Sequence, residues 1–289
     1  MNFREKLLAG QFVVTGEIAP KKGVDISGII EAIKHLRGVD AVNVTDNQRA
    51  CVRLSSLAAS KILLDNGVEP IYQLTCRDRN RIALQSDLLG AWILGIKNVL
   101  VISGDHPSLG DHPYAKPVYD LDSVQLISTI KGLNQGQDLE GNKLNQPADY
   151  LIGAAANPGA DDLDAEILKV EKKILSGAVF LQTQAVYDVE LFKTFMEKVK
   201  PLGIPVLAGI VPLKSAKMAS FMNENIPGIH VPKHLIQELS DSDNPTQAGI
   251  VQAAKIIKDV KKHCNGIHLM SLGWEDKVQE ILQKAGLRQ

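Results

Sequence analysis

Polar side chains lie at or just after the ends of several short apolar segments of this chain. Carboxylates, amides and hydroxyls are the groups that transfer protons, hold polar substrate atoms and stabilise charge in enzyme sites. If the apolar segments are strands ending at one edge, these side chains meet in a single pocket. The residues concerned are Glu17, Asn43, Thr45, Asp46, Gln73, Thr75, Ser103, Asp105, Asn157, Gln184 and Ser271.

Eight such segments are rich in Val, Ile and Leu, which is typical of strands buried on both faces. Stretches of helical period separate them, and strict alternation implies parallel strands with right-handed crossovers. We therefore expect an α/β fold, a (β/α)8 TIM barrel, forming one domain over residues 1–289. The predicted strands are Phe12–Ile18, Ala41–Thr45, Glu69–Thr75, Asn98–Ser103, Tyr150–Ala155, Val179–Gln184, Pro205–Ile210 and Gly266–Ser271.

The predicted helices follow these strands, and several end at a glycine, which is the usual C-cap residue. The first has one apolar face, with Asp25 as the expected N-cap. An open doubly wound sheet is the alternative fold, but no G-x-G-x-x-G follows the first strand. Predicted helices are Asp25–Arg37, Leu54–Asn66, Arg81–Leu94, Asp122–Leu133, Asp164–Leu175, Asp188–Lys200, Ser215–Asn225, Lys233–Leu239, Thr246–His263 and Glu275–Ala285.

Two long loops interrupt the pattern. Residues 106–118 follow the fourth strand, so we expect them at the catalytic end of the barrel, where they can cover a ligand. Residues 134–149 follow a helix, so we expect them at the opposite end in a structural role.

Composition excludes several classes of function. The 32 basic and 33 acidic residues give a net charge of −1 without a basic cluster, so no nucleic-acid partner is expected. No lysine lies in a predicted strand and no histidine pair has ligand spacing, which disfavours a Schiff-base aldolase and a metal site. Three dispersed cysteines, no signal peptide and no long apolar run predict a soluble, cytoplasmic protein without membrane association.

Six short motifs occur in order at these strand ends, and together they resemble the methylenetetrahydrofolate reductase family over essentially the whole chain. A further segment, G-Q-D-L-E-G-N-K-L, resembles an insertion in anaerobic and other bacterial members. The six motifs are T-G-E-I-A-P around Glu17, V-N-V-T-D at Thr45, Q-L-T-C-R-D from Gln73, I-S-G-D at Asp105, G-A-A-A-N-P at Asn157 and Q-T-Q at Gln184.

The resemblance implies a flavin-dependent reduction of 5,10-methylenetetrahydrofolate to 5-methyltetrahydrofolate, with FAD or FMN as cofactor and NADH or NADPH as a candidate electron donor. Glu17 matches the family's general acid, and Asp105 an aspartate that stabilises the substrate iminium. Gln184 matches a glutamine that binds the pterin, and Met218 lies at a substrate-side position. Implied cofactor-binding residues are Thr45, Gln73, Ser103, Gly104, Asp105, Tyr119, Ala155, Asn157, Glu166 and Lys173.

Each of these residues also has a purely structural interpretation. Glu17 could cap its strand and pair with Lys21, and Asp105 could form an Asx turn in G-D-H-P. Gln184 could be a satisfied buried amide, and Glu166 and Lys173 could lie on a solvated helix face.

Some positions depart from the family pattern. Gln73 stands where many members have a histidine, and Ala156 where many have an aromatic residue, which leaves FAD against FMN open. Met218 and Met222 replace a glutamine and a phenylalanine, and Trp274 replaces an arginine expected near the folate tail.

These substitutions leave the electron donor open. We expect the chain to form a homo-oligomer or a complex with an electron-transferring partner subunit. A flavin-free pterin-binding methyltransferase barrel, and a subunit that is inactive alone, are the alternative functions.

Overall fold

Eight parallel strands close into a barrel in the computed structural model, which describes residues 1–287. The strands pair in chain order, and β8 closes the barrel by pairing with β1 from Val13↔Gly266 to Gly16↔Leu269. This confirms the predicted (β/α)8 fold, and every predicted strand is found within two residues of its expected ends. The strands are β1 (Val13–Ile18), β2 (Ala41–Val44), β3 (Pro70–Thr75), β4 (Asn98–Ile102), β5 (Leu151–Ala156), β6 (Phe180–Ala185), β7 (Val206–Ile210) and β8 (Gly266–Leu269).

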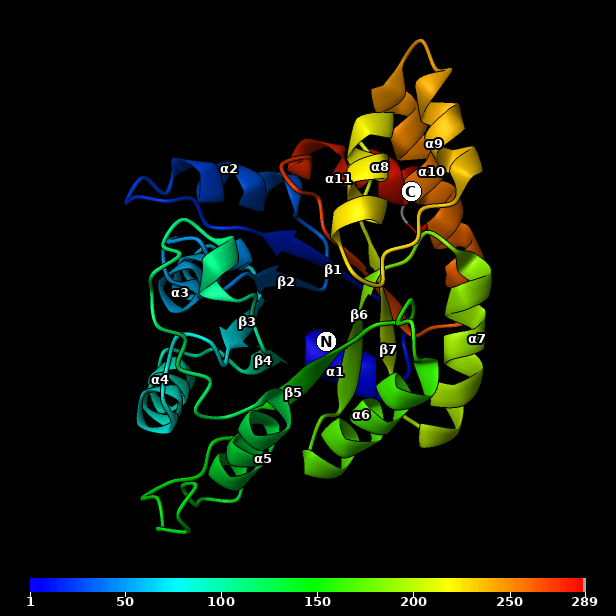
Figure 1. Ribbon diagram of the computed structural model, residues 1–289. Helices are drawn as coiled ribbons and strands as arrows, with labels where there is room; N and C mark the ends of the chain where they lie inside the picture. Colours follow the sequence, from blue (N-terminus) through cyan, green and yellow to red (C-terminus); the bar gives the residue numbers. More distant parts are fainter. Residues whose placement is uncertain (288–289) are drawn as a thin grey trace.

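Helices surround the strands (Figure 1) and bury their apolar faces against them. Short 3₁₀ turns lie at Gln48–Ala50, Pro107–Leu109, Lys200–Leu202 and Glu275–Lys277. The helices are α1 (Phe3–Leu8), α2 (Ser27–His35), α3 (Ser56–Asp65), α4 (Arg81–Ile93), α5 (Ser123–Asn134), α6 (Leu163–Ser176), α7 (Val189–Val199), α8 (Ala216–Asn225), α9 (Lys233–Ser240), α10 (Pro245–Val260) and α11 (Val278–Lys284).

Helix α2 corrects the predicted N-cap. Asp25 accepts hydrogen bonds from the backbone N–H and the hydroxyl of Ser27, both at 2.9 Å. The carboxylate thus bonds a residue two positions ahead, in an Asx turn, and the helix begins only at Ser27 after Ile26, which makes no side-chain cap bond. Asp25 was therefore wrongly expected to cap the helix itself.

Helix α1 closes the amino end of the barrel, a feature that the sequence patterns did not predict. Phe3 and Leu7 are each 1% exposed, and the Phe3 ring meets that of Phe180 edge to face, with centroids 5.7 Å apart. They complete an apolar layer inside the barrel that also contains Val13, Ala41, Ile71, Leu100, Leu151 and Leu207. A ligand must therefore enter from the carboxyl ends of the strands.

Above this apolar layer the interior becomes polar. Since alternate strand residues face the interior, side chains two positions further along each strand form the next layer, and those four positions further reach the mouth. The middle layer carries Thr15, Asn43, Gln73, Gln182 and His268, and the mouth carries Glu17, Thr45, Thr75 and Gln184.

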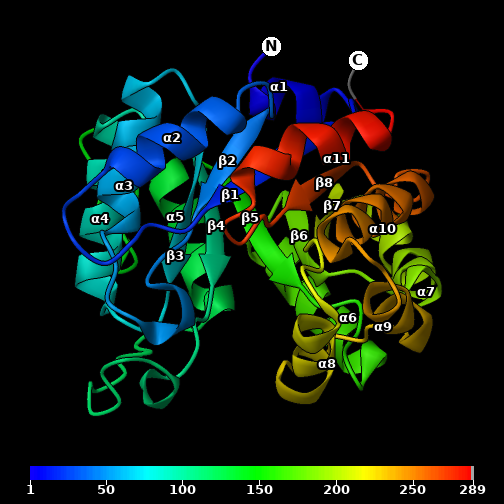
Figure 2. The same cartoon turned by 90° about the horizontal axis from the view of Figure 1, so that it is seen from above.

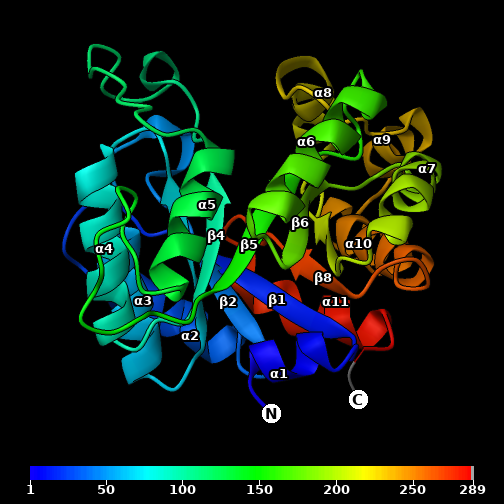
Figure 3. The same cartoon turned by 90° about the horizontal axis from the view of Figure 1, so that it is seen from below.

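The loop after β4 and helix α8 project beyond the strands at the end of the molecule opposite α1 (Figures 2 and 3). Residues 106–118 thus lie at the carboxyl end of the barrel, as predicted. None of the helices within residues 1–287 has the length and apolar character that crossing a bilayer requires.

Candidate active site

Glu17 lies on β1 at the barrel mouth, where it is 7% exposed. Its Oε2 is 3.4 Å from Nε2 of His268, a fully buried residue of β8. In the part of the chain that the structure describes, Glu17 thus pairs with His268 and not with Lys21. Its second oxygen, Oε1, has no protein hydrogen-bond partner there, so this oxygen is free to contact a ligand.

A chain of hydrogen bonds determines which way the His268 ring is protonated. Gln73 Nε2 donates to Asn43 Oδ1 at 3.3 Å, so the Asn43 amide turns its Nδ2 toward His268 Nδ1, 3.2 Å away. Because Nδ2 is a donor, Nδ1 of the neutral ring must accept, and the ring hydrogen lies on Nε2. Thr15 Oγ1 also faces Nδ1 at 3.0 Å. In this tautomer the ring donates to Glu17 Oε2, and Oε1 stays unpaired within residues 1–287.

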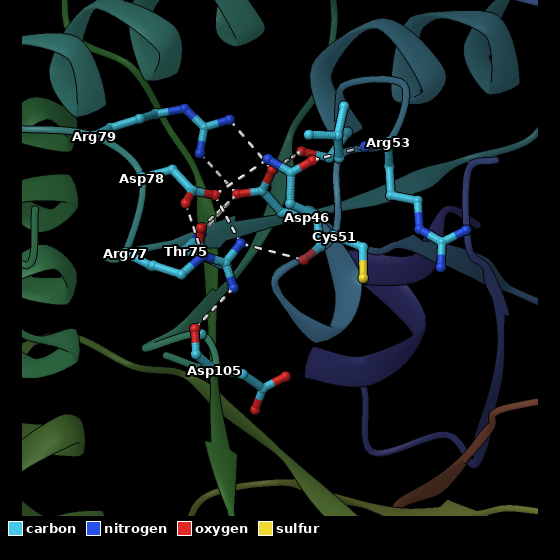
Figure 4. Close-up of polar contacts among 12 residues, drawn as sticks. Asp46, Cys51, Arg53, Thr75, Arg77, Asp78, Arg79 and Asp105 are labelled. Atoms are coloured by element: carbon cyan, nitrogen blue, oxygen red, sulfur yellow. Dashed lines mark hydrogen bonds and ion pairs between the residues drawn. The ribbon is translucent and has the colours of Figure 1, made fainter. Parts of the chain in front are cut away.

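A second polar cluster joins the ends of β2 and β3 (Figure 4). The carboxylate of Asp46, 2% exposed, accepts from the backbone N–H and the hydroxyl of Thr75 at 3.0 and 2.8 Å, and from the hydroxyl of Ser56 at 3.1 Å. Arg79 adds two charged hydrogen bonds at 2.7 and 3.2 Å. These contacts satisfy the buried charge and set the position of Thr45, the residue before Asp46.

Arg77, 2% exposed, connects three loops of the catalytic end. It binds Asp78 through two hydrogen bonds of 2.7 Å and donates to the carbonyl oxygens of Asn47 and Asp105, each at 3.2 Å. Burial alone would lower the pKa of the Arg77 guanidinium, but the bonds to Asp78 outweigh burial and raise that pKa, so Arg77 stays charged.

Arg77 thereby holds the backbone of Asp105 after β4, while the exposed Asp105 carboxylate makes no hydrogen bond within residues 1–287. The expected Asx turn at Asp105 is not formed. His106 instead caps the following turn, accepting from the Ser108 N–H at 3.2 Å. An unpaired carboxylate at the mouth is suited to a cationic ligand group.

Gly104 and Tyr119 shape the wall beside Asp105. Gly104 has φ +85°, and a Cβ there would lie 3.0 Å from Arg77 Nη1 and 3.1 Å from Thr75 Cγ2, so glycine is needed for both conformation and space. The Tyr119 hydroxyl donates to the Gly104 carbonyl at 2.9 Å. Burial raises the pKa of Tyr119, so the phenol keeps this donor.

Residues 106–118 are tied to the loops after β1 and β2. Asp111 accepts from the Val52 N–H at 3.0 Å and forms an ion pair with Lys22 at 2.6 Å. Beneath the loop lies a partly open hollow bordered by Asn47, Ala50, Cys51, Val52, Arg77, Asp78, Pro107, His112, Ala115 and Lys116. The loop therefore stands beside the barrel mouth and does not seal it.

The predicted residues on β5 and α6 form a support for the loop after β5. Glu166, 7% exposed, accepts from the Asn157 N–H at 2.9 Å, and Lys173 donates to the Ala155 carbonyl at 2.6 Å. Burial lowers the pKa of Lys173. Neither residue lies on a solvated helix face. Glu166 thus orients the backbone just after β5, and Lys173 bonds the backbone of β5 near its carboxyl end.

The remaining predicted residues lie around the rim. Gln184 is exposed and its amide has no hydrogen-bond partner among residues 1–287, so it is not a satisfied core amide. Ser103 is exposed directly after β4, and Met218 is half-buried in the first turn of α8. Near the end of β8, Lys214 lies 5.2 Å from the ring centroid of Trp274. The structure thus places Glu17, Thr45, Ser103, Gly104, Asp105, Ala155 and Gln184 at the carboxyl ends of the strands, with Tyr119 bonded to Gly104 and Gln73 one layer deeper in the barrel.

His268, Gln182 and Arg79 are site residues that the polar strand ends do not reveal. His268 and Gln182 lie within strands, not at their ends. A detectable signal exists, because a His within I-H-L and a Gln within L-Q-T interrupt apolar strands at positions that alternate inward. Buried polar residues at such positions require partners or a ligand.

Comparison with known proteins relates the chain to one family. The family model described as methylenetetrahydrofolate reductase matches residues 2–286. A Caenorhabditis elegans protein named probable methylenetetrahydrofolate reductase (NADPH) is 25% identical over 81% of this chain and 34% of its own length. A Salmonella typhimurium protein named 5,10-methylenetetrahydrofolate reductase is 26% identical over 68% of this chain and 61% of its own. The chain thus spans less than two thirds of these relatives.

Solved structures support the fold. An uncharacterized Clostridium thermocellum protein, described as binding two copies of 5-methyl-5,6,7,8-tetrahydrofolic acid, superposes with a TM-score of 0.68 at 18% identity, covering 98% of both chains. A 2,3-dimethylmalate lyase superposes with a TM-score of 0.56 at 11% identity, covering 99% of this chain and 83% of its own. Likeness at this identity establishes the barrel alone, whereas the family match rests on sequence: the chain belongs to the methylenetetrahydrofolate reductase family.

Proposed function

We propose that the barrel mouth reduces 5,10-methylenetetrahydrofolate to 5-methyltetrahydrofolate with a bound flavin, as one catalytic unit. The observation that carries this proposal is the position of Glu17 at the end of β1, where Oε2 contacts His268 and Oε1 has no hydrogen-bond partner within residues 1–287. The family match and the folate ligand of the Clostridium thermocellum structure are consistent with a folate substrate.

Glu17 acts as the general acid in this proposal. The five-membered ring of the substrate must open before the one-carbon unit accepts a hydride, and opening requires a proton on the bridging nitrogen. Glu17 supplies it from Oε1, since Oε2 is held by the Nε2–H of His268. After transfer, the same hydrogen bond stabilises the carboxylate that Glu17 becomes.

Asp105 and Gln184 act on the substrate without transferring a proton. Ring opening leaves a cationic iminium, and the unpaired carboxylate of Asp105 stabilises positive charge near it. The exposed amide of Gln184 has free donors and an acceptor for the polar edge of the pterin. Met218, on the first turn of α8, offers a polarisable apolar surface to a flat ring.

The residues expected to hold a flavin fit such a group. Thr45, 3% exposed, has a buried hydroxyl without a hydrogen-bond partner, and a polar atom of a cofactor would satisfy it. We assign Ser103, Gly104, Tyr119, Ala155 and Asn157 to the same cofactor site, because they lie at or after the ends of β4 and β5, and Tyr119 bonds the Gly104 carbonyl. When bound there, the flavin supplies the hydride. Experiment must decide whether the flavin is FAD or FMN, and whether NADH, NADPH or a partner subunit donates the electrons.

Mass spectrometry of the ligand released from purified, denatured protein tests the cofactor directly. We expect one equivalent of FAD or FMN, and reduction of an acceptor dye when 5-methyltetrahydrofolate is added. A colourless protein that binds folate without redox activity would instead indicate a pterin-binding methyltransferase. A protein that holds flavin but reduces no dye until a partner is added would show an incomplete subunit.

Replacing Gly104 with alanine should weaken flavin binding. Gly67→Ala is the matched control, because Gly67 also has positive φ, +75°, but open space around it. The left-handed backbone costs an alanine about 1 kcal/mol at either site. At Gly104 the new methyl group also presses on Arg77 and Thr75. We therefore expect Gly104→Ala to lower the free energy of unfolding by about 2 kcal/mol and to raise the flavin Kd roughly 10-fold.

Urea denaturation and flavin titration of both variants measure these effects. Gly67→Ala should keep the wild-type flavin Kd. Equal flavin affinities for the two variants would show that Gly104 does not contribute to the cofactor site.

A further inference from the structure

Gln182 is a buried amide without a partner. It lies on β6, is 6% exposed, and its Oε1 is sealed from solvent without a hydrogen bond. Nor does its Nε2 bond any of the residues 1–287. The cause is visible in the sheet register, since its neighbours across the strands are Ala155 and Leu207, which have no hydrogen-bonding side chains.

Such an amide lowers the stability of the fold when no ligand is bound. Burying a polar group without a hydrogen bond costs free energy, and an apolar side chain of the same shape would avoid that cost. The interior of the barrel thus keeps an unsatisfied group directly below its open end.

Gln182 lies on the inner face of β6. Phe180, two residues earlier, belongs to the apolar layer that closes the barrel, so alternation turns Gln182 into the interior. The register of β6 against β7 shifts between Gln182 and Ala185, and the exposed Gln184 lies within this irregular end of the strand. A ligand that enters the mouth beside the end of β6 therefore approaches the Gln182 amide.

We propose that Gln182 binds the amide-like edge of the pterin, which presents a ring N–H beside a carbonyl. A primary amide can bond this edge with the one group that faces the ligand: its NH₂ donates to the carbonyl, or its oxygen accepts from the ring N–H. A half-turn about the last side-chain bond exchanges Oε1 and Nε2, so either atom can face the ligand. The inference rests on the proposed folate site. It assigns the pterin to β6, whereas the cofactor residues lie on β2 to β5.

Gln182→Met tests this assignment, because methionine has similar length and no hydrogen-bonding amide. The matched control is Gln252→Met on α10, where the wild-type amide donates to the Leu235 carbonyl and the Glu238 carboxylate at 3.0 and 2.9 Å. Flavin-loaded protein is titrated with 5-methyltetrahydrofolate, flavin affinity is measured separately, and Tm is recorded for each variant.

We expect Gln182→Met to raise the Kd for 5-methyltetrahydrofolate about 10-fold, with flavin affinity unchanged and Tm unchanged or higher. Gln252→Met should lower Tm and leave the folate Kd unaltered. A lower Tm for Gln182→Met, or an unchanged folate Kd, would overturn the inference, and weaker flavin binding would reassign Gln182 to the cofactor. If wild-type protein binds no folate at all, the proposed function fails first.

Discussion

Glu17→Gln is expected to lower the rate of methylene reduction by roughly 10²- to 10⁴-fold, the range typical of a lost general acid. Glutamine keeps the shape of the side chain and can still accept from His268 Nε2, but it carries no transferable proton. Folate binding should persist, because the substitution removes no other ligand contact. Stopped-flow measurement of the two half-reactions separates the effects: reduction of the flavin by its donor should remain near the wild-type rate.

The contribution of His268 is tested by combining substitutions. His268 contacts Glu17 at 3.4 Å and lies beneath it, so we expect it to act through Glu17 and not on substrate directly. His268→Asn should slow the folate half-reaction less than Glu17→Gln does, and the double variant should be no slower than Glu17→Gln alone. Independent, multiplicative losses would show that His268 has a separate role. Wild-type folate turnover in Glu17→Gln would eliminate the acid assignment itself.

Much of this site could be predicted because, in a parallel barrel, alternate residues of each strand face the interior and all strands end at the same side. Once the strand ends were recognised, residues such as Glu17, Thr45 and Gln184 had to lie at the same end of the barrel, and the structure places them there. The expected roles of these residues came from the family resemblance that the motifs carry, because position along a strand does not indicate a chemical role. Position therefore follows from local patterns, provided that the strands are recognised correctly.

Pairings between distant segments could not be predicted in the same way. Glu17 and His268 are 251 residues apart, and they meet only because β8 closes the barrel against β1. Asp46 and Arg79 are separated by 33 residues, and their ion pair depends on the loop after β3 folding back over β2. Neither local periodicity nor a short motif specifies such contacts. Glu166 and Lys173 were expected to contact a cofactor because of the family resemblance, and that expectation stays a prediction; what local patterns did not predict is that they bond the backbone of Asn157 and Ala155.

Arg79→Met is expected to lower the free energy of unfolding by about 3–5 kcal/mol, since it leaves the Asp46 carboxylate buried without its cation. Arg79 is 16% exposed at its side chain, Asp46 is fully covered, and Arg79 also contacts Asp87 at 2.8 Å. Arg81→Met is the matched control: Arg81 also forms two side-chain hydrogen bonds with an aspartate, Asp120, both at 3.0 Å, but these side chains are 43% and 29% exposed. Screening by solvent should keep the loss there below about 1 kcal/mol.

Guanidinium denaturation of the two variants measures this contrast, and a double variant identifies its cause. If the cost arises from an uncompensated charge, Asp46→Asn combined with Arg79→Met should lose less than the sum of the single losses, by about 1–3 kcal/mol. Strict additivity would mean that Arg79 stabilises through packing on β3 and not through Asp46. Because Asp46 also binds both the backbone and the hydroxyl of Thr75, the single variant Arg79→Met should loosen the strand ends around Thr45. Its flavin Kd should therefore rise together with its loss of stability, whereas Arg81→Met should change neither appreciably.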